Sequence, residues 1–458
     1  MECLKLQDVV YAVKGQIISG DIKDKIISSV ATDSRVNMPE GLFIAIKGEN
    51  TDGHKYIEGA TQNGAIAALI SDEPEQYIEG IVYIKVEDTV SALQDLAAWY
   101  RMQFNIPVVA VTGSVGKTTT KDMIFSVLST KFKVLKTEGN FNSEIGAPLT
   151  VLRLNKKYEM AVIEMGMDHL GQIANISKVV KPDTAVITNI GVAHLEYLKT
   201  RENILKAKCE VFENLETDGV AILNADDDML VNVDNNFKKV WFGTGENADI
   251  KAENVVIDYT NGVVRADILI NDCKYNLIIP GLSEHLVYSA MAAIAVGLRY
   301  NLTIEEVLKG VANYTHTKMR MDIYKLKDNI LVIDDTYNAN PDSMKSLIDT
   351  VKKADVKNKI LILGDMFELG ENSIKLHKQV LEYAINANTT QIIVTGENMK
   401  EASRTINNNV IIAYENKENV INNIDSIILK DSIIAIKASR GMKFEKITEK
   451  ILEIYEVL

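Results

Sequence analysis

The chain has 458 residues, of which 47% are hydrophobic and 25% are charged. At roughly 150 residues per domain this length exceeds one compact core, so we expect two or three domains, and the composition excludes a disordered or fibrous protein. The formal net charge of -13 argues against nonspecific binding to nucleic acid or anionic lipid, and three cysteines without paired spacing favour reduced thiols.

The sequence predicts neither export nor membrane insertion. The N-terminus contains acidic residues and no long apolar stretch, and no window reaches the roughly 18 uninterrupted apolar residues that span a bilayer. A basic stripe with interleaved aromatic residues, which would indicate nucleic-acid binding, is absent. We therefore expect a cytoplasmic protein, with a monomer as the default, that neither enters the membrane nor binds nucleic acid.

Residues 1–104 are predicted to form a small α/β domain. Short apolar and β-branched runs predict its strands, and amphipathic spacing predicts its helices. The strands are expected within 28–35, 41–48, 67–71 and 82–86, and the helices within 54–65 and 89–104. Pro107 disfavours helix at the residue before it, and a continuous apolar run follows, so a domain boundary is expected near residue 105.

Residues 105–316 are predicted to form a second α/β domain. Four buried strands are expected from VVAVTG, MAVIEMG, DTAVITNI and GVAILNAD, with helices at 117–130 and 201–214. This alternation is typical of a doubly wound parallel sheet. After Asp249, period-two runs around the turn at Asn261 and Gly262 predict an antiparallel edge, and two helices are expected at 283–300 and 303–313.

Residues 317–458 are predicted to form a third α/β domain, which is Rossmann-like. ILVIDDT, KILILGDM, QIIVTG, VIIAY and DSIIAIKAS alternate with helical segments. One of these helices begins near Pro341, where the missing N–H of proline has little cost. The fold class is therefore α/β with three domains, at 1–104, 105–316 and 317–458.

The strongest local signal is TGSVGKTT, which joins a buried strand to a helix. Gly113 and Gly116 allow backbone N–H groups to converge on phosphate oxygens, Lys117 supplies a positive charge, and the hydroxyl of Thr118 can reach Mg²⁺. The usual GxxxxGK[ST] spacing would require a glycine where Val111 stands. We nevertheless interpret this shorter loop as a phosphate-binding site.

Three further side chains follow the phosphate loop in order. Glu164 ends a predicted strand, where a carboxylate can bind a metal ion. His194 also follows a buried strand, and Lys208 lies on a predicted helix. Each has an ordinary alternative: a solvated strand end, a structural histidine and a solvent-facing lysine. They are candidate active-site residues only because they follow the phosphate loop in this order along the chain.

The third segment contains a polar turn between a strand and a helix. DDTYNANPDSM places Asp334, Asp335, Asn338 and Asn340 there, and such turns often do no more than cap the helix. Lys437 and Arg440 follow the last predicted strand, and Asp365 and Glu368 lie in LGDMFELG after another.

Taken together, these motifs resemble the Mur ligase family, ATP-dependent amide-forming enzymes of peptidoglycan precursor synthesis. TDSR with GLFIAIKGENTDGHKYI resembles the uridine-nucleotide domain of its MurE and MurF branches. GSVGKTTT, EGNFNSEIGAPLT, EMG, NIGVAHLE and AKCEVF resemble the ATPase domain. MRMD, DDTYNANPDSM and LGDMFELG resemble the third domain of the MurF branch, and the DNPR signature of the MurE branch is absent from the sequence.

The resemblance implies a reaction and its partners. The terminal carboxylate of UDP-N-acetylmuramoyl-tripeptide would attack the γ-phosphate of ATP, and D-alanyl-D-alanine would then displace phosphate from the acyl phosphate. Two Mg²⁺ ions and Lys117 would offset the negative charge. The junctions near 105 and 316 would be hinges for a closure that excludes water.

The resemblance also implies residue roles. Catalysis would use Lys117, Lys208, His194 and Glu164, and the metal ligands would be Thr118, Glu164, His194 and a carbamylated Lys208. ATP would be bound by Gly113, Ser114, Val115, Gly116, Lys117, Thr118, Thr119, Arg320, Asp335 and Asn340. The substrates would be bound by Ser34, Arg35, Asn140, Asn142 and Asn338.

The sequence departs from the family pattern in two places. Leu286 and Ser289 stand where the family usually has two asparagines near the nucleotide base, and Ala438 stands where a glycine is expected. Two alternatives remain open: an amino-acid ligase of the MurE branch acting on the dipeptide precursor, and a non-catalytic nucleotide-binding relative. The sequence does not distinguish lysine from diaminopimelate at the third peptide position.

Overall fold

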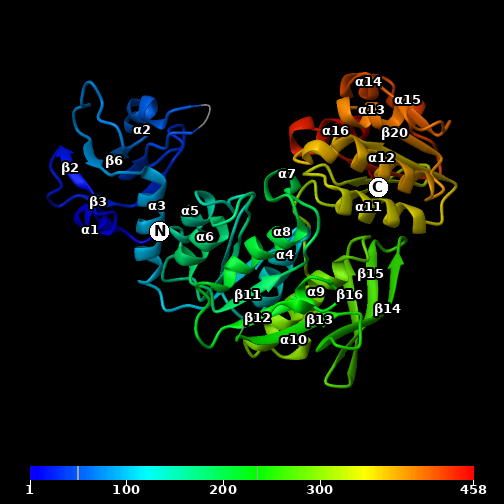
Figure 1. Ribbon diagram of the computed structural model, residues 1–458, viewed down its shortest axis with the longest axis horizontal. Coiled ribbons are helices and arrows are strands. Elements are labelled where there is room, and N and C mark those ends of the chain that lie inside the picture. The colour runs from blue at the N-terminus through cyan, green and yellow to red at the C-terminus, as the bar shows by residue number, and fades with distance from the viewer. Residues whose placement is uncertain (49–50, 235) are drawn as a thin grey trace. The chain divides into compact units, whose positions relative to one another are not determined.

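The computed structural model describes residues 1–48, 51–234 and 236–458, and helices alternate with strands along the chain (Figure 1). The chain divides into two compact units. The first consists of Met1–Thr112, Phe132–Ala185 and Cys209–Val220, and the second of Gly113–Lys131, Val186–Lys208 and Ala221–Leu458. Because this division passes through the central segment, the domain boundaries expected near residues 105 and 316 stay predictions.

The N-terminal part of the first unit contains a five-stranded sheet in the order β2-β7-β6-β5-β4. Strands β4 to β7 are parallel to their neighbours, and β2 is antiparallel to β7. The strands are β2 (Gln16–Ser19), β4 (Ser29–Ala31), β5 (Gly41–Ile44), β6 (Ala65–Ile70) and β7 (Val82–Lys85), and β1 (Leu4–Lys5) pairs separately with β3 (Ile26–Ile27). The helices are α1 (Leu6–Ala12), α2 (Ile57–Gln62) and α3 (Thr89–Arg101).

Helix α3 ends in an arginine that holds the segment leading out of the N-terminal sheet. Arg101 is 7% exposed, and its guanidinium donates hydrogen bonds to the carbonyl oxygens of Val180 (3.0 Å), Phe104 (2.7 Å) and Ile106 (3.0 Å). Burial lowers the pKa of Arg101. Tyr100, beside it, donates to the carbonyl of Leu154 at 2.7 Å. These bonds satisfy the buried cation and fix the course of residues 102–107.

The first unit also contains the parallel strands β8, β10 and β9, in that order. Their bounds are β8 (Val108–Thr112), β9 (Val134–Lys136) and β10 (Met160–Glu164), and the helices α5 (Gly146–Val151) and α6 (Gln172–Val180) belong to the same unit. Every residue of β8 and β10 is buried, as expected for parallel strands covered on both faces. The strands β11 (Thr184–Ile187) and β12 (Val220–Asn224) contribute residues to both units.

In the second unit, the antiparallel edge predicted after Asp249 is confirmed. Strands β14 and β15 are antiparallel, as are β15 and β16, and Gly262 in the predicted turn has a φ of +69°. Strand β13, which the sequence did not predict, is parallel to β14. The elements are α4 (Lys117–Leu128), α7 (Leu195–Leu198), α8 (Arg201–Cys209), β13 (Lys238–Gly243), β14 (Ile250–Asp258), β15 (Val263–Ile270), β16 (Cys273–Pro280), α9 (Leu286–Arg299) and α10 (Ile304–Ala312).

The C-terminal part of the second unit is a six-stranded sheet with the order β17-β18-β22-β19-β20-β21. All neighbouring pairs are parallel except β17 with β18, which confirms the predicted Rossmann-like fold. Its strands are β17 (Asp322–Leu326), β18 (Ile330–Asp334), β19 (Asn358–Leu363), β20 (Gln391–Val394), β21 (Ile411–Ala413) and β22 (Ser432–Lys437). Its helices are α11 (Pro341–Lys353), α12 (Ser373–Ile385), α13 (Glu397–Arg404), α14 (Lys417–Asn422), α15 (Ile424–Ile427) and α16 (Glu445–Ile454).

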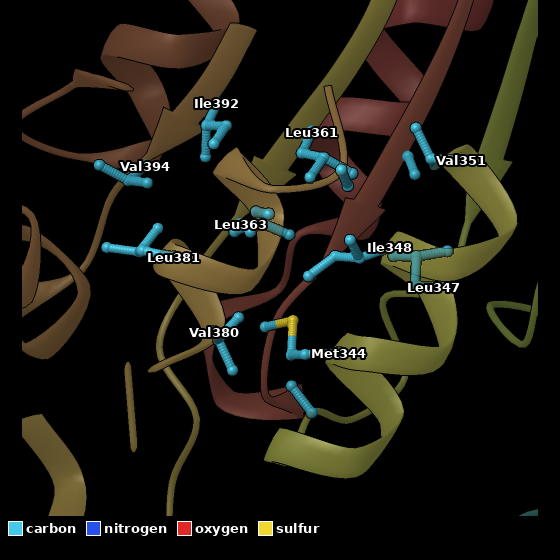
Figure 2. Packing of buried hydrophobic residues seen from close by; sticks show 14 of the residues in the cluster. Met344, Leu347, Ile348, Val351, Leu361, Leu363, Val380, Leu381, Ile392 and Val394 are labelled. Carbon is cyan, nitrogen blue, oxygen red and sulfur yellow. The ribbon is translucent and has the colours of Figure 1, made fainter. Parts of the chain in front are cut away.

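One hydrophobic core of this sheet lies against α11 and α12 (Figure 2). Met344, Leu347 and Ile348 of α11 point toward side chains of β19 and α12, and all three are fully buried. Burying an apolar side chain of this size stabilises the folded state by roughly 1.5–3 kcal/mol. The packing of these three residues therefore holds the first turns of α11 against the sheet. Among the described residues, none of the helices combines the length and the apolar character needed to cross a membrane.

Candidate active site

The phosphate loop runs from Gly113 to the first residue of α4, Lys117. Both of its glycines have positive φ, +148° at Gly113 and +80° at Gly116. A Cβ atom at Gly113 would lie 1.9 Å from Oγ1 of Thr188, so only glycine can occupy this position without displacing its neighbours. The loop thus ends at the N-terminus of α4, where the helix dipole favours an anion.

Two residues that the sequence analysis did not single out hold this loop in shape. The backbone N–H of Ser114 donates to the carbonyl of Asn189 at 3.0 Å, and the N–H of Val115 donates to Oδ1 of Asn189 at 3.0 Å. The carbonyl of Val115 accepts hydrogen bonds from Thr188 Oγ1 (2.7 Å) and Asn189 Nδ2 (3.0 Å). Their only signal in the sequence is that two polar residues follow a buried strand. The loop is therefore preorganised before any ligand binds.

A cavity of about 470 Å³ lies beside the phosphate loop. Its volume is within the range of small-molecule sites. It is lined by Val115, Gly116, Thr120, Thr188, Asn189, Ile190, Gly191, Val192, Arg201, Asn224, Phe242, His285, Tyr288, Ser289, Asp342 and Ser346. The cavity combines backbone amides, hydroxyls and aromatic rings, which is the chemistry required to bind a nucleotide.

One wall of the cavity comes from α9 and the residue before it. The hydroxyl of Tyr288 donates to Asp226 Oδ2 at 2.9 Å, and Ser289 Oγ lies 2.9 Å from Thr120 Oγ1 on α4. Burial lowers the pKa of His285, which favours the neutral ring. Of the two departures from the family pattern, Ser289 lines the cavity, whereas Leu286 is 5% exposed and is not among the lining residues.

The first turns of α11 also line the cavity. Asp342 Oδ2 accepts a hydrogen bond from the N–H of Val192 at 3.2 Å, and Ser346 lines the cavity one turn further along. Arg201 donates to the carbonyl of Ile190 at 2.7 Å and forms an ion pair with Asp228 at 2.6 Å. The cavity is therefore built by the phosphate loop together with a helix of the C-terminal sheet.

The two candidate lysines lie in the second unit. Lys117 begins α4, and its Nζ donates to the carbonyl of Gly113 at 2.8 Å. Lys208, on α8, is 1% exposed. Its pKa is well below the usual range, first because of burial and second because of the positive charge of Lys117. Burial thus disfavours the charged form of the Lys208 amine.

His194 lies at the start of α7 in a left-handed conformation, with a φ of +60°. Its Nδ1 atom is buried and lies 2.8 Å from Oε2 of Glu368, although the angles of this contact are not those of a hydrogen bond. Glu368 also has a positive φ, +61°. The structure thus brings His194 to one of the acidic residues of LGDMFELG, a contact that the sequence did not predict.

Glu164 and Asn142 lie together in the first unit. Glu164 is 2% exposed, and its Oε1 accepts a hydrogen bond from Asn142 Nδ2 at 2.8 Å. The N–H of Glu164 donates to Thr137 Oγ1 at 2.9 Å, and Asn140 is exposed on the same loop as Asn142. Within the described part of the chain, no three His, Cys, Asp or Glu side chains gather so that they alone could hold a metal ion.

The polar turn before α11 contains a buried ion pair. Lys437 is 2% exposed, pairs with Asp335, and donates to the carbonyl of Asn338 at 2.8 Å. Burial lowers the pKa of Lys437, and the charge of Asp335 opposes that shift. Asn340 caps α11, because its Oδ1 accepts from the N–H of Ser343 at 2.8 Å. The structural role considered for this turn thus applies to Asn340, whereas Asn338 is exposed.

Arg320, Ser34 and Arg35 are the remaining residues that the sequence predicted to bind ATP or substrate. The guanidinium of Arg320 lies 4.0 Å from the centre of the Tyr337 ring, and its buried Nε makes no hydrogen bond with any described residue. In the first unit the side chain of Arg35 is 87% exposed and bonds to Asp33 at 2.7 Å, which lowers the pKa of Asp33 to about 2. The backbone carbonyl of Ser34 accepts a hydrogen bond from the side-chain Nδ2 of Asn63 at 2.8 Å.

Three parts of the chain match domains of one protein family. Residues 26–101 match the Mur ligase family catalytic domain, residues 111–297 match the Mur ligase middle domain, and residues 319–440 match the Mur ligase glutamate ligase domain.

Curated relatives and solved structures agree with these matches over nearly the whole chain. A UDP-N-acetylmuramoyl-tripeptide--D-alanyl-D-alanine ligase of Bacillus subtilis is 36% identical, covering 98% of each chain, and the Escherichia coli ligase of the same name is 32% identical, covering 95% of this chain and 97% of its own. A crystal structure of MurF from Acinetobacter baumannii has a TM-score of 0.91 at 30% identity and 99% coverage of both chains. MurF ligase from Thermotoga maritima in complex with ADP has a TM-score of 0.83 at 29% identity, covering 93% of this chain and 97% of its own.

Proposed function

The chain belongs to the Mur ligase family. On this premise we propose that it is a ligase of the MurF branch, which uses ATP to join D-alanyl-D-alanine to UDP-N-acetylmuramoyl-tripeptide. The observation that carries the proposal is the near-full-length similarity to ligases named for this reaction, from distant bacteria and across all three segments. The product is UDP-N-acetylmuramoyl-pentapeptide, a precursor for peptidoglycan synthesis.

ATP binds in the 470 Å³ cavity, with its phosphates on the loop of Gly113, Ser114, Val115 and Gly116. Support comes from the positive φ of both glycines and from a related ligase that was solved with ADP. Lys117, Thr118 and Thr119 follow directly, so their charge and hydroxyls lie at the N-terminus of α4. Arg320, Asp335 and Asn340 approach from the C-terminal part, where Arg320 has a buried donor available.

The reaction proceeds in two steps. An oxygen of the terminal carboxylate of the tripeptide attacks the γ-phosphorus of ATP, which gives an acyl phosphate and releases ADP. The amine of D-alanyl-D-alanine then attacks the acyl carbon, the amide bond forms, phosphate leaves, and the amine loses a proton. Lys117 stabilises the negative charge on the transferring phosphoryl group, and the protein excludes water from the acyl phosphate.

Two Mg²⁺ ions are proposed to be held by Thr118, Glu164, His194 and Lys208. Thr118 and Glu164 offer oxygen donors, which suit Mg²⁺, and His194 would add a ring nitrogen. Lys208 would join them as a carbamate, and its lowered pKa favours the uncharged amine that reacts with carbon dioxide. When bound, the ions supply charge neutralisation for phosphoryl transfer. Asn142 orients the carboxylate of Glu164 through the hydrogen bond at 2.8 Å.

The remaining assignments are part of the same proposal. Ser34 and Arg35 bind the uridine diphosphate, for which an exposed guanidinium is suited, and Asn140 and Asn142 bind the tripeptide end. Asn338 binds D-alanyl-D-alanine. We propose that the protein acts as a cytoplasmic monomer with domains at 1–104, 105–316 and 317–458; the family matches at 26–101, 111–297 and 319–440 support the three segments.

The acceptor amine tests the proposal against the MurE branch. We expect release of phosphate when ATP and UDP-N-acetylmuramoyl-tripeptide are supplied with D-alanyl-D-alanine, with both lysine-containing and diaminopimelate-containing tripeptides tested. We expect none when the dipeptide precursor is supplied with free lysine or diaminopimelate. The reverse pattern would assign the chain to the MurE branch, and ATP binding without any turnover would favour the non-catalytic relative.

A further inference from the structure

The segment that leads to the C-terminal sheet is bonded to the helix that follows the phosphate loop. Thr317 Oγ1 donates a hydrogen bond to Asp122 Oδ2. Asp122 lies on α4, one helical turn after Thr118, and is 3% exposed. Because α4 begins at the phosphate-binding lysine, this bond joins the linker to the same rigid element that would hold the nucleotide.

The environment of this bond makes it strong. Asp122 is also 3.2 Å from the ammonium of Lys121, which is 2% exposed, so the acceptor is a buried, charged carboxylate. Hydrogen bonds to charged groups are stronger than neutral ones, and a low local dielectric increases the effect. The hydroxyl of Tyr314, a buried residue on the same linker, lies 3.5 Å from Nδ1 of His316. His316 Nε2 is 3.1 Å from the carbonyl of Pro280. The linker is thus fixed as far as Thr317.

Beyond Thr317 the chain passes to the C-terminal part within a few residues. The N–H of Arg320 donates to the carbonyl of Thr317 at 3.1 Å, so Thr317 also forms one end of the turn that presents Arg320. Met319 has a φ of +63°, and its carbonyl accepts from the N–H of Tyr337 at 3.1 Å. Arg320 is stacked on the Tyr337 ring and has a buried Nε donor. It therefore lies in a turn whose first residue, Thr317, is bonded to α4.

We propose that Thr317 is a positioning residue, which holds Arg320 in register with the phosphate loop through its bond to Asp122. This inference rests on the proposed function, because it takes Arg320 as a group that contacts ATP. A continuous series of contacts joins the phosphate loop to Arg320. Lys117 and Thr118 begin α4, and Asp122 lies one helical turn further along the same helix. Thr317 bonds to Asp122, and the turn that begins at Thr317 contains Arg320. A bond that only stabilised the fold would affect unfolding but not the turnover of the folded enzyme.

The test compares three variants of the full-length protein. Thr317→Val keeps the shape of the side chain and removes the donor, and Thr317→Ser restores the donor. Ser126→Ala is the matched control, because Ser126 on the same helix donates to the carbonyl of Gly310 at 2.7 Å, away from the linker. We expect Thr317→Val to lower kcat about tenfold, as for loss of a charge-assisted hydrogen bond, with the Kd for ADP changed less than twofold.

Rescue and the control decide between positioning and simple stability. Thr317→Ser should return kcat to within about threefold of the parent, and Ser126→Ala should keep the parental kcat although its Tm falls as much as that of Thr317→Val. An unchanged kcat in Thr317→Val, or an equal kcat loss in Ser126→Ala, would overturn the proposal. If Thr317→Val does not fold, Asp122→Asn, which keeps an oxygen acceptor without the charge, must lower kcat at parental ADP affinity. A parent without turnover would instead refute the proposed function.

Discussion

Replacing Lys208 by alanine is expected to lower kcat about a thousandfold while the protein stays folded. Lys208 is 1% exposed and lies close enough to Lys117 for that charge to lower its pKa. A structural role alone explains a buried lysine poorly, because a hydrophobic side chain of similar size would cost less free energy to bury. As a carbamate it would instead supply an anionic ligand for Mg²⁺, and losing such preorganised electrostatic groups costs 10²–10³ or more in turnover.

Chemical rescue distinguishes a carbamate from a neutral lysine. Lys208→Ala leaves a cavity in which a short carboxylic acid such as acetate can place the missing oxygen atoms, and part of the activity should return. Lys208→Met fills the same space with a side chain of similar length and should be inactive with or without acetate. If both variants kept the parental kcat, the metal-bridging role would be wrong, and rescue of both would point to an effect of acetate elsewhere.

Lys208→Met also has an expected effect on stability. Because the pKa of Lys208 in the folded protein is below its usual value near 10.5, the unfolded chain binds more protons at neutral pH. This cost to folding is fully present below the folded pKa and disappears as the pH rises toward the unfolded pKa. Without bicarbonate, Lys208→Met should therefore be more stable than the parent at pH 7, with a smaller difference at pH 10. A loss of stability at pH 7 would contradict the assigned neutral amine.

Replacing Lys117 by methionine is expected to lower kcat at least a hundredfold and to weaken ATP binding. Lys117 begins α4 at the end of a loop whose glycines have positive φ, and its Nζ is 2.8 Å from the carbonyl of Gly113. The phosphates would recruit this charge from the loop, where it stabilises the transferring phosphoryl group. Lys131→Ala provides the control: it also removes one positive charge, but beyond the C-terminal end of α4.

The two Lys117 measurements are steady-state turnover and the Kd for ADP. Lys131→Ala should match the parent in both, since its bond to the carbonyl of Asn301 lies beyond the C-terminal end of α4 and not at the phosphate loop. Parental turnover in Lys117→Met would mean that the loop does not bind the reacting phosphates. An equal loss in Lys131→Ala would mean that overall charge, rather than the position of Lys117, controls activity.

The local motifs were the part of this protein that the sequence could predict. The loop between β8 and α4 was predictable because a buried apolar run is followed by glycines and then by a helical segment, and the structure has a strand, a loop with two positive-φ glycines and a helix there. Phosphate binding by this loop stays a prediction. The antiparallel edge was predictable because period-two runs meet at Asn261 and Gly262, and it is confirmed. Strand β13 was not predicted, because it begins with two lysines and only its last two residues are buried. It therefore lacks the continuous apolar run that indicated the buried parallel strands of this segment.

The groups that surround the nucleotide cavity could not be predicted, because they come from distant parts of the chain. Asn189 holds Val115 across 74 positions, and Asp342 reaches Val192 across 150. Only tertiary packing brings these residues together, and their local sequence does not indicate which distant residue each one contacts. For the same reason the sequence could not separate the helix-capping role of Asn340 from a ligand-binding one.

The most direct test of the proposed ligase is the stoichiometry of its products. The parent protein is incubated with ATP, Mg²⁺, UDP-N-acetylmuramoyl-tripeptide and D-alanyl-D-alanine, and the pentapeptide, ADP and phosphate are quantified together. We expect the three products in equal amounts, and no sustained ADP release when either peptide substrate is omitted. Release of ADP and phosphate without pentapeptide, or no product from a protein that binds ATP, would contradict the assignment.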